Sequence, residues 1–232
     1  MSNFLDIVWT PVSFTHVEYE KGDQFGKFLA WTSLFPFVVL SGFLTHIYFR
    51  REIHTIVFFI GIFLNEMVNY IVKHIVQEPR PDSGHTTLNV KHGWPSSHSQ
   101  FSWFFFTYLI LFIYIRSHNN NTTLDLMWKH CMSALCVIAG CVVSYSRVYL
   151  LYHTVNQIVW GCIFGTMLGL SWFAVAQILL TPFFPFVVTW RVCEFFMIRD
   201  STLIPNIMWF EYTTSRQESR SRSRKMSSNK LQ

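Results

Sequence analysis

The sequence predicts an all-α fold: a polytopic integral membrane bundle of about five transmembrane helices, followed by an interfacial C-terminal segment. Composition is the first observation behind this prediction, because 51% of the 232 residues are hydrophobic and only 13% are charged. Soluble globular domains carry roughly 25% charged residues, about twice this fraction. The second observation is that the apolar residues gather in five stretches, each close to the roughly 20 residues that a helix needs to cross a bilayer.

The five stretches follow one another with short polar connections. The first two run over residues 28–49 and 53–72. The third and fourth, 100–115 and 131–145, are short, so we expect their helices to extend into the flanking polar residues. The fifth runs over residues 154–180 and completes the bundle.

The stretches divide the chain into four parts. Residues 1–27 are an N-terminal lumenal segment without the apolar run of a cleavable signal peptide. Residues 28–181 form the transmembrane domain. Residues 182–212 are apolar but contain Arg191 and Glu194, which favours a helix in the membrane interface over a sixth span. Residues 213–232 are rich in Ser and Arg, so we expect a basic, disordered cytoplasmic tail that does not bind nucleic acid.

Positive residues predict the orientation, because cytoplasmic loops carry the excess of Lys and Arg. Five alternating helices put the C-terminus on the more basic side, which should be cytoplasmic, and place the N-terminal segment in the lumen. The sequons at Asn120 and Asn121 then face the cytoplasm and should carry no glycan. Twelve of the 18 cations lie on the cytoplasmic side (Arg50, Arg51, Arg116, Lys129, Arg191, Arg199, Arg216, Arg220, Arg222, Arg224, Lys225, Lys230) and six on the other (Lys21, Lys27, Lys73, Arg80, Lys91, Arg147).

A first polar block follows the second apolar stretch and contains Lys73 and Arg80. Pro79 ends the helix, because the residue before a proline avoids the α conformation and proline has no N–H group. Arg80 lies between two prolines, so its backbone has little freedom and its guanidinium could bind phosphate oxygens in pairs. The alternative is an ordinary pair of cations that anchors a helix end at the interface.

A second block, Pro95-Ser96-Ser97-His98, opens the third stretch. Ser97 and Gln100 have the spacing of a capping box, which predicts a helix start here. The free N–H groups of such a start attract anions. His98 lies in the first turn, where it could protonate a leaving oxygen; a helix cap with an interfacial histidine is the alternative.

A third block links the fourth and fifth stretches. Ser146 and Arg147 precede His153 by a few residues, and Gln157 follows His153 by four, on the same helix face. A neutral histidine that donates its Nδ1–H keeps the Nε2 lone pair free for attack, and the Gln157 carbonyl could accept that hydrogen bond. An ordinary polar loop is the alternative.

All three blocks fall on one side of the membrane, although helices of alternating direction would scatter random polar residues over both sides. The patterns K-x6-R-P, P-S-x-H and S-R-x5-H resemble the type 2 phosphatidic acid phosphatase (PAP2) superfamily of lipid phosphatases. The resemblance implies that His153 is the nucleophile that forms a phosphohistidine, and that His98 is first the general acid and then the base. It also implies that no metal or other cofactor is needed, and that the phosphoryl oxygens are held by Lys73, Arg80, Arg147, Ser96 and the backbone of Ser97.

The chain departs from the family pattern at two positions. Ser97 replaces the glycine of P-S-G-H, which a helical backbone tolerates, and Gln157 replaces the acidic residue four positions after the nucleophile. Glu66 is the candidate for the missing acid, since it shares a helix stripe with Lys73; it could instead neutralise Lys73. Ser146 and Gln157 would support the site.

Within the superfamily, the stretches QEPRP, PSSHSQF, SRVYLLYHT and EFFMIRDSTLIPNIMWFEYT resemble the dolichyldiphosphatase family of the endoplasmic reticulum. This implies hydrolysis of dolichyl diphosphate, a polyprenyl lipid of the bilayer, to dolichyl phosphate at the lumenal face, recycling the carrier for N-glycosylation. A broader lipid phosphate or prenyl diphosphate phosphatase, and an inactive scaffold that binds lipid head groups, remain alternatives. Lys91 and His92 could contact an additional phosphate or lie in a solvated loop.

Overall fold

The computed structural model describes residues 9–11, 17–81, 92–116, 122–204 and 206–229. In these parts of the chain, five helices are long and apolar enough to cross a membrane, which confirms the predicted polytopic α-helical bundle. Asn120, Asn121 and Lys91 lie outside the described residues. The five spans are Gln24–Arg50, Ile53–Val76, Ser97–Arg116, Thr123–Tyr149 and Val155–Val187.

The first span begins earlier than the apolar pattern predicts. Asp23 caps helix α1, because its side chain accepts a hydrogen bond of 3.0 Å from the backbone N–H of Phe25. A small antiparallel sheet, in which Thr10 pairs with Tyr19, precedes this cap. The elements of this part are β1 (Trp9–Pro11), β2 (Glu18–Glu20), α1 (Gln24–Trp31), η2 (Thr32–Leu34) and α2 (Phe35–Arg50).

The other four spans overlap the predicted stretches, and the third and fourth extend into polar sequence as expected. The fifth continues to Val187, past its predicted end at residue 180, so the first residues of the predicted interfacial segment belong to this span. Helix α4 continues through one π-helical turn, and so does α6. The elements are α3 (Ile53–Val76), α4 (Ser97–Leu111), η3 (Phe112–Arg116), α5 (Thr123–Tyr149), α6 (Val155–Ala174) and η4 (Val175–Leu180).

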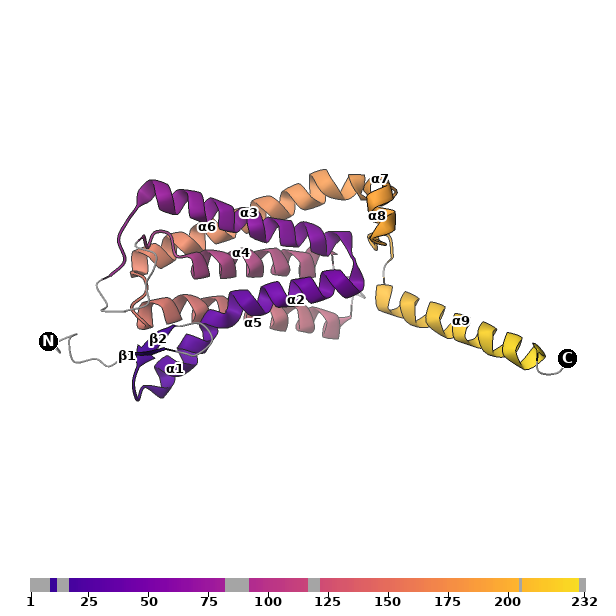
Figure 1. The fold of residues 1–232 in the computed structure, drawn as a ribbon, viewed down its shortest axis with the longest axis horizontal. Helices are drawn as coiled ribbons and strands as arrows, with labels where there is room; N and C mark the ends of the chain where they lie inside the picture. The colour runs from indigo at the N-terminus through magenta and orange to yellow at the C-terminus, as the bar shows by residue number, and fades with distance from the viewer. Residues whose placement is uncertain (1–8, 12–16, 82–91, 117–121, 205, 230–232) are drawn as a thin grey trace.

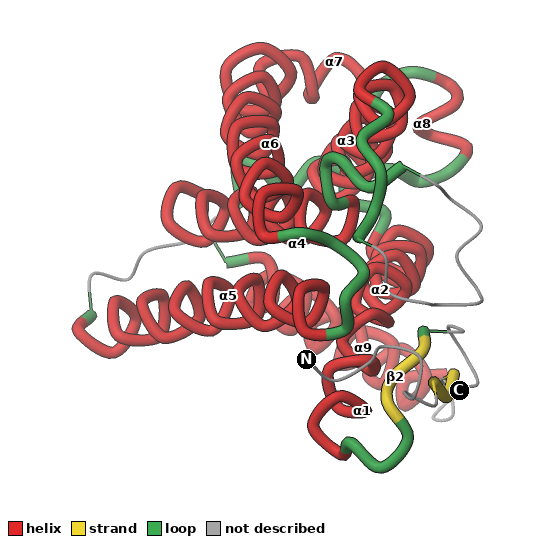
Figure 2. The backbone as a smooth tube through the Cα atoms, turned by 90° about the vertical axis from the view of Figure 1, so that its left-hand side faces the viewer, coloured by secondary structure: helices red, strands yellow, loops and turns green. Residues whose placement is uncertain are grey.

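Helix α4 lies in the middle of the bundle and contacts α2, α3, α5 and α6 (Figure 2). At one end, on the left in Figure 1, α3 and α5 end and α4 and α6 begin. We call this the site end. It is the end at which all three polar blocks meet, because each block lies in one of the connections or helix ends found there.

The closest packing in the bundle joins α4 to α6. Gly161, Gly165 and Gly169 recur every four residues on α6 and face the backbone of α4. A Cβ atom at Gly161 would lie 2.8 Å from the carbonyl oxygen of Ser96, and one at Gly169 would lie 3.0 Å from that of Phe104. Small residues at this spacing let two membrane helices approach closely, so this face of α6 fixes the position of α4.

We expect Gly165→Ala to destabilise the protein, because the new Cβ would overlap the carbonyl oxygen of Gln100. Forcing α4 away from α6 should cost about 1–3 kcal/mol. Gly42→Ala is the matched control, since a Cβ at Gly42 meets no atom within 4 Å. Thermal unfolding of both variants in detergent measures the difference, and equal melting temperatures would contradict the packing argument.

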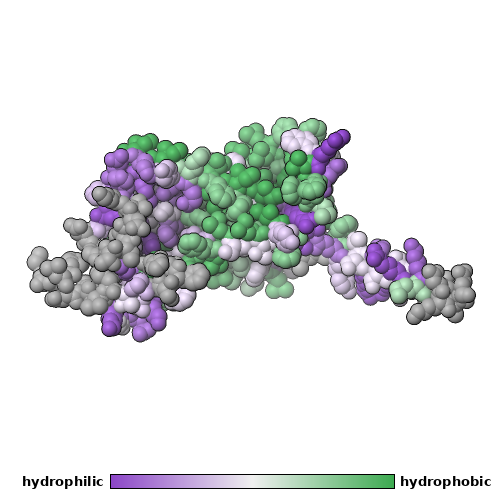
Figure 3. Space-filling model, viewed as in Figure 1, coloured by the Kyte–Doolittle hydropathy of each residue, from purple (hydrophilic) through white to green (hydrophobic). Residues whose placement is uncertain are grey.

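The surface divides into zones that suit a bilayer. Apolar side chains cover the middle of the bundle, and hydrophilic ones gather at the site end, on the left in Figure 3. Large apolar side chains of the spans are exposed, among them Phe37, Phe63, Ile71, Leu135 and Met167. The chain is therefore an integral membrane protein, as its composition predicts.

The C-terminal segment is tied to the opposite end of the bundle. Glu52 forms an ion pair of 2.7 Å with Arg199, and Arg50 forms one of 2.6 Å with Glu211. Among the described residues of this segment no sixth span is found. Its elements are η5 (Thr181–Phe183), α7 (Phe184–Val187), α8 (Arg191–Phe195) and α9 (Ile207–Asn229).

The expectation of a disordered tail over residues 213–232 was wrong for the part that is described. Helix α9 continues to Asn229 and projects away from the bundle (Figure 1). No glycine or proline interrupts residues 207–229, and Arg222 pairs with Glu218 one turn earlier at 2.7 Å. Disorder was predicted because this region is rich in Ser and Arg, a composition that is also compatible with an exposed helix.

Candidate active site

The end of α3 places two cations at the site end. Lys73 is buried in the last turn of the helix. Gln77 then adopts a left-handed conformation, with φ of 54°, and ends the helix. After this turn Arg80 reaches back to the connection between α5 and α6, where its Nη1 lies 3.5 Å from the carbonyl oxygen of Tyr152.

The start of α4 supplies Ser96, Ser97 and His98. Ser97 is the first helical residue and has a helical backbone, so the serine fits this position. The predicted capping box was wrong: the N-cap is Ser96, and its side chain makes no capping hydrogen bond. Ser96 is instead fully buried, and its backbone N–H donates to the carbonyl oxygen of Gln157 at 3.0 Å.

Gln100 does not cap α4 because its amide is used between helices. Its Nε2 donates to the backbone and side-chain oxygens of Asn65, each at 3.1 Å. Its Oε1 accepts from Asn69 Nδ2 at 2.8 Å. This buried amide cluster fixes the start of α4 against α3, and hence the second polar block against the first.

The connection from α5 to α6 holds Arg147 and His153. Arg147 is buried, donates from Nη2 to the hydroxyl of Ser33, and lies over the Tyr152 ring at 5.0 Å. The backbone N–H of His153 donates to the backbone carbonyl oxygen of Arg147 at 3.1 Å, which holds the backbones of the two residues close together. The Ser146 hydroxyl donates to the backbone carbonyl oxygen of Val143 at 2.7 Å, within its own helix. This hydrogen bond stabilises the end of α5.

Gln157 determines which nitrogen of His153 carries the proton. Its Oε1 faces two groups, the backbone N–H of Thr154 at 3.3 Å and Nδ1 of His153 at 3.2 Å. Its Nε2 faces the carbonyl oxygen of Pro79 at 2.8 Å. Because Thr154 N–H only donates and the carbonyl only accepts, the amide has one favourable orientation. Its oxygen must accept from His153, so Nδ1 is protonated and Nε2 keeps its lone pair.

The three polar blocks meet in one cluster. Both His98 and His153 have Arg80, Arg147 and Lys73 as electrostatic neighbours. Burial, followed by these three cations, lowers the pKa of His153 well below its usual value of 6.5, so the ring is neutral. His98 hydrogen-bonds the backbone carbonyl of Ser33, which orients its ring.

The cluster also has unused donors. Among the described residues, the Nε–H groups of Arg80 and Arg147 are buried and have no hydrogen-bond partner. Buried donors are normally paired, so two free guanidinium N–H groups beside Lys73 are suited to an anion.

A model of the PAP2 superfamily matches residues 54–180, which is more than half of the chain. The chain belongs to the PAP2 superfamily. Two relatives named dolichyldiphosphatase 1, from Rhinolophus ferrumequinum and Homo sapiens, are 53% and 52% identical to it; each match covers 94% of this chain and 93% of the relative. The transmembrane PAP2-type phosphatidylglycerolphosphate phosphatase of Bacillus subtilis has the same fold, with a TM-score of 0.51 and 18% identity over 66% of this chain and 74% of its own.

PAP2 proteins usually carry an acidic residue four positions after the nucleophile, where this chain has Gln157. Glu66 was the candidate for this acid, but among the described residues the carboxylate that contacts Gln157 is that of Glu78, whose Oε1 lies 2.9 Å from Gln157 Nε2. Glu66 instead lies near Lys73 and lines a cavity of about 280 Å³ together with Ser97 and His98. Glu78 escaped the sequence analysis because its partner is 79 residues away along the chain.

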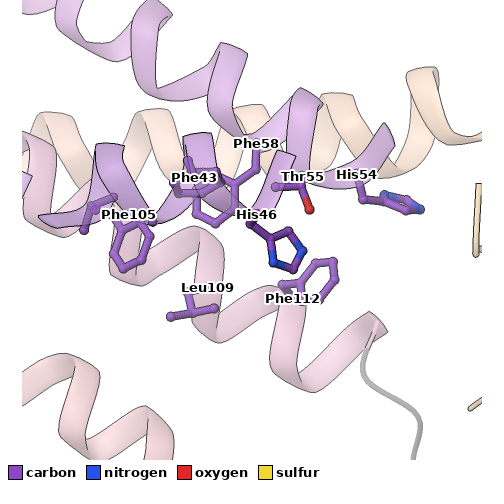
Figure 4. A pocket seen from close by; sticks show the side chains of 10 residues that line it. Phe43, His46, His54, Thr55, Phe58, Phe105, Leu109 and Phe112 are labelled. Carbon is purple, nitrogen blue, oxygen red and sulfur yellow. The ribbon is translucent and has the colours of Figure 1, made fainter. Parts of the chain in front are cut away.

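A separate apolar cavity of about 330 Å³ lies away from the PAP2 motifs (Figure 4). Its two histidines, His46 and His54, come from the end of α2 and the start of α3, opposite the site end. His54 contacts Thr202 and Arg116, each at 2.8 Å, and so helps to hold the C-terminal segment. Neither histidine belongs to the candidate active site.

Proposed function

We propose that this chain is a membrane phosphatase that hydrolyses dolichyl diphosphate to dolichyl phosphate and phosphate through a phosphohistidine intermediate. The observation that carries the proposal is the meeting of two histidines with the same three cations, with His153 Nε2 left as the free nucleophilic nitrogen. The names of the relatives, dolichyldiphosphatase 1 at 52–53% identity, support the choice of substrate.

In the first step, the Nε2 lone pair of His153 attacks the terminal phosphorus of the substrate. The bond between this phosphorus and the bridging oxygen breaks, and dolichyl phosphate leaves. His98, protonated when the anionic diphosphate is bound beside it, transfers its proton to the departing oxygen. The product of this step is a phosphohistidine that keeps the Nδ1–H hydrogen bond to Gln157.

In the second step, His98 is neutral and takes a proton from water while the water oxygen attacks the phosphorus. The phosphorus–nitrogen bond breaks, and His153 recovers its lone pair. Phosphate leaves, and His98 again carries the proton that the next cycle needs. Together, the two steps use one water molecule and break one phosphoanhydride bond.

The cations stabilise the charge that develops on the phosphoryl oxygens. Arg80 and Arg147 each have a buried Nε–H group without a partner among the described residues, and Lys73 adds a third charge. Ser96 contributes a hydroxyl: it accepts from Ser99 at 3.3 Å, so its own proton can donate to the phosphate. The first backbone N–H groups of α4, which begins at Ser97 without a side-chain cap, would donate to the same anion.

The lipid chain is proposed to enter between α2, α3 and α4. The cavity beside His98 is lined by Phe37 and Phe63, which are also exposed on the membrane-facing surface. A prenyl chain could therefore stay among lipids while its diphosphate reaches the cations. We place the protein in the endoplasmic reticulum membrane, with the site end in the lumen and the C-terminus in the cytoplasm, as the distribution of cations favours.

A comparison of four substrates with purified protein, in the presence of a chelator, tests the proposal. We expect kcat/KM for dolichyl diphosphate to exceed that for dolichyl phosphate, phosphatidate and a soluble diphosphate, each by at least about tenfold. Equal rates on phosphatidate would make the chain a broader lipid phosphatase. No phosphate release from any substrate would favour the inactive lipid-binding scaffold.

A further inference from the structure

A phosphohistidine at His153 would lie next to a neutral amide, because Gln157 is the side chain that contacts Nδ1. When His153 is phosphorylated on Nε2 while Nδ1 keeps its proton, the ring gains positive charge. Lys73, Arg80 and Arg147 already surround it, and Gln157, which contacts Nδ1, is neutral. A negative charge on the far side of the Gln157 amide would offset this positive charge.

Glu78 is in that position. Its Oε1 lies 2.9 Å from Gln157 Nε2, and the same amide accepts from His153 Nδ1 at 3.2 Å through its oxygen. The three groups form a continuous chain of hydrogen bonds, from carboxylate to amide to imidazole. Such a chain polarises the amide, so that its oxygen becomes a stronger acceptor for the Nδ1 proton.

The backbone holds Glu78 in this place. The left-handed residue Gln77 ends α3 and redirects the chain. The carbonyl oxygen of Glu78 then accepts a hydrogen bond of 2.7 Å from Gly93 N–H, and Pro79 forms a β-bridge with His92. A Cβ atom at Gly93 would lie 2.6 Å from Gln157 Oε1, so any larger residue there would displace the Gln157 amide.

Glu66, the alternative acid, does not reach the amide. Among the described residues, Glu66 Oε1 lies 3.5 Å from Asn65 Nδ2, Lys73 is its electrostatic neighbour, and its side chain lines the cavity beside His98. Glu66 therefore lies beside a phosphate-binding cation and the cavity of the acid–base histidine.

We infer that Glu78 is a positioning residue: acting through Gln157, it orients His153 and offsets the charge that phosphorylation places on its ring. It would take the role of the acidic residue that PAP2 proteins usually carry four positions after the nucleophile. This inference rests on the proposed function. The other role open to Glu78 is a purely structural tie between the α3–α4 connection and α6.

Glu78→Gln separates the two roles, because a glutamine oxygen still accepts from Gln157 but carries no charge. We expect kcat on dolichyl diphosphate to fall about 10- to 100-fold, as activity does when the carboxylate behind a metal-bound histidine is lost. KM and the melting temperature should stay unchanged, and rapid-quench experiments should show slower phosphoenzyme formation. Glu194→Gln, at an exposed position at the opposite end, is the matched control and should behave as wild type.

The double variant Glu78→Gln/Gln157→Glu returns the charge to the hydrogen-bond chain, one position closer to His153. We expect it to be several times more active than Glu78→Gln alone. The inference is overturned if Glu78→Gln keeps wild-type kcat, or if the double variant shows no recovery. Either result leaves the proposed function standing as long as wild type releases phosphate and His153→Ala does not.

Discussion

Replacement of His153 by alanine should abolish phosphate release from dolichyl diphosphate, with a fall in kcat on the order of 10⁴-fold or more. The reason is that no other group can replace the nucleophile: His98 hydrogen-bonds the Ser33 carbonyl, and its place in the scheme is proton transfer. The fold should survive, because Gln157 Oε1 still accepts from the backbone N–H of Thr154. Phosphate release and thermal unfolding, measured on the same detergent preparation, test both expectations.

Two further variants make the His153 result specific. His46→Ala removes an exposed histidine far from the site end and should retain full activity. His98→Ala should lose activity on dolichyl diphosphate but keep more of it on an aryl phosphate, whose leaving group needs little protonation. His153→Ala should lose activity on both substrates. Residual turnover by His153→Ala within 100-fold of wild type would refute a phosphohistidine at this position.

The arrangement of the polar blocks could be predicted because it depends on local sequence and on the alternation of helix direction. Lys73, His98 and His153 each lie at the end of an apolar stretch, so counting spans was enough to place them on one side. The contact between His153 and Gln157 also followed from sequence, since residues four apart share a helix face.

The contacts that failed to follow from sequence are those between distant segments. Ser97 and Gln100 satisfy the spacing of a capping box, yet Asn65 and Asn69 on another helix take up the Gln100 amide. The capping box that does form joins Thr154 and Gln157. From sequence, Glu78 could not be distinguished from an ordinary polar residue in a turn. Its contact with Gln157 arises only from the fold. Several polar groups could hydrogen-bond the amide of Gln100 or Gln157. Tertiary packing decides which of them does, and the pattern of a single sequence does not show that packing.

The second large effect is expected at Arg147. This side chain is buried, is an electrostatic neighbour of both histidines, and has a free Nε–H group. Arg147→Ala should lower kcat/KM by about 10³-fold, comparable to removal of one donor to a developing oxyanion. Arg147→Lys should lose less, about 10²-fold, because a lysine keeps the charge but lacks the planar fork that binds two oxygens at once.

Arg147 also has a structural role, so its test needs a variant that removes only that role. Ser33→Ala deletes the hydroxyl that accepts from Arg147 Nη2, while it leaves the guanidinium and the Ser33 carbonyl in place. We expect Ser33→Ala to lose only a few-fold in kcat/KM. If Ser33→Ala were as inactive as Arg147→Ala, the loss would arise from disturbed packing at the end of α5. Because the guanidinium has donors left over after this contact, we expect the anion itself to be its principal partner.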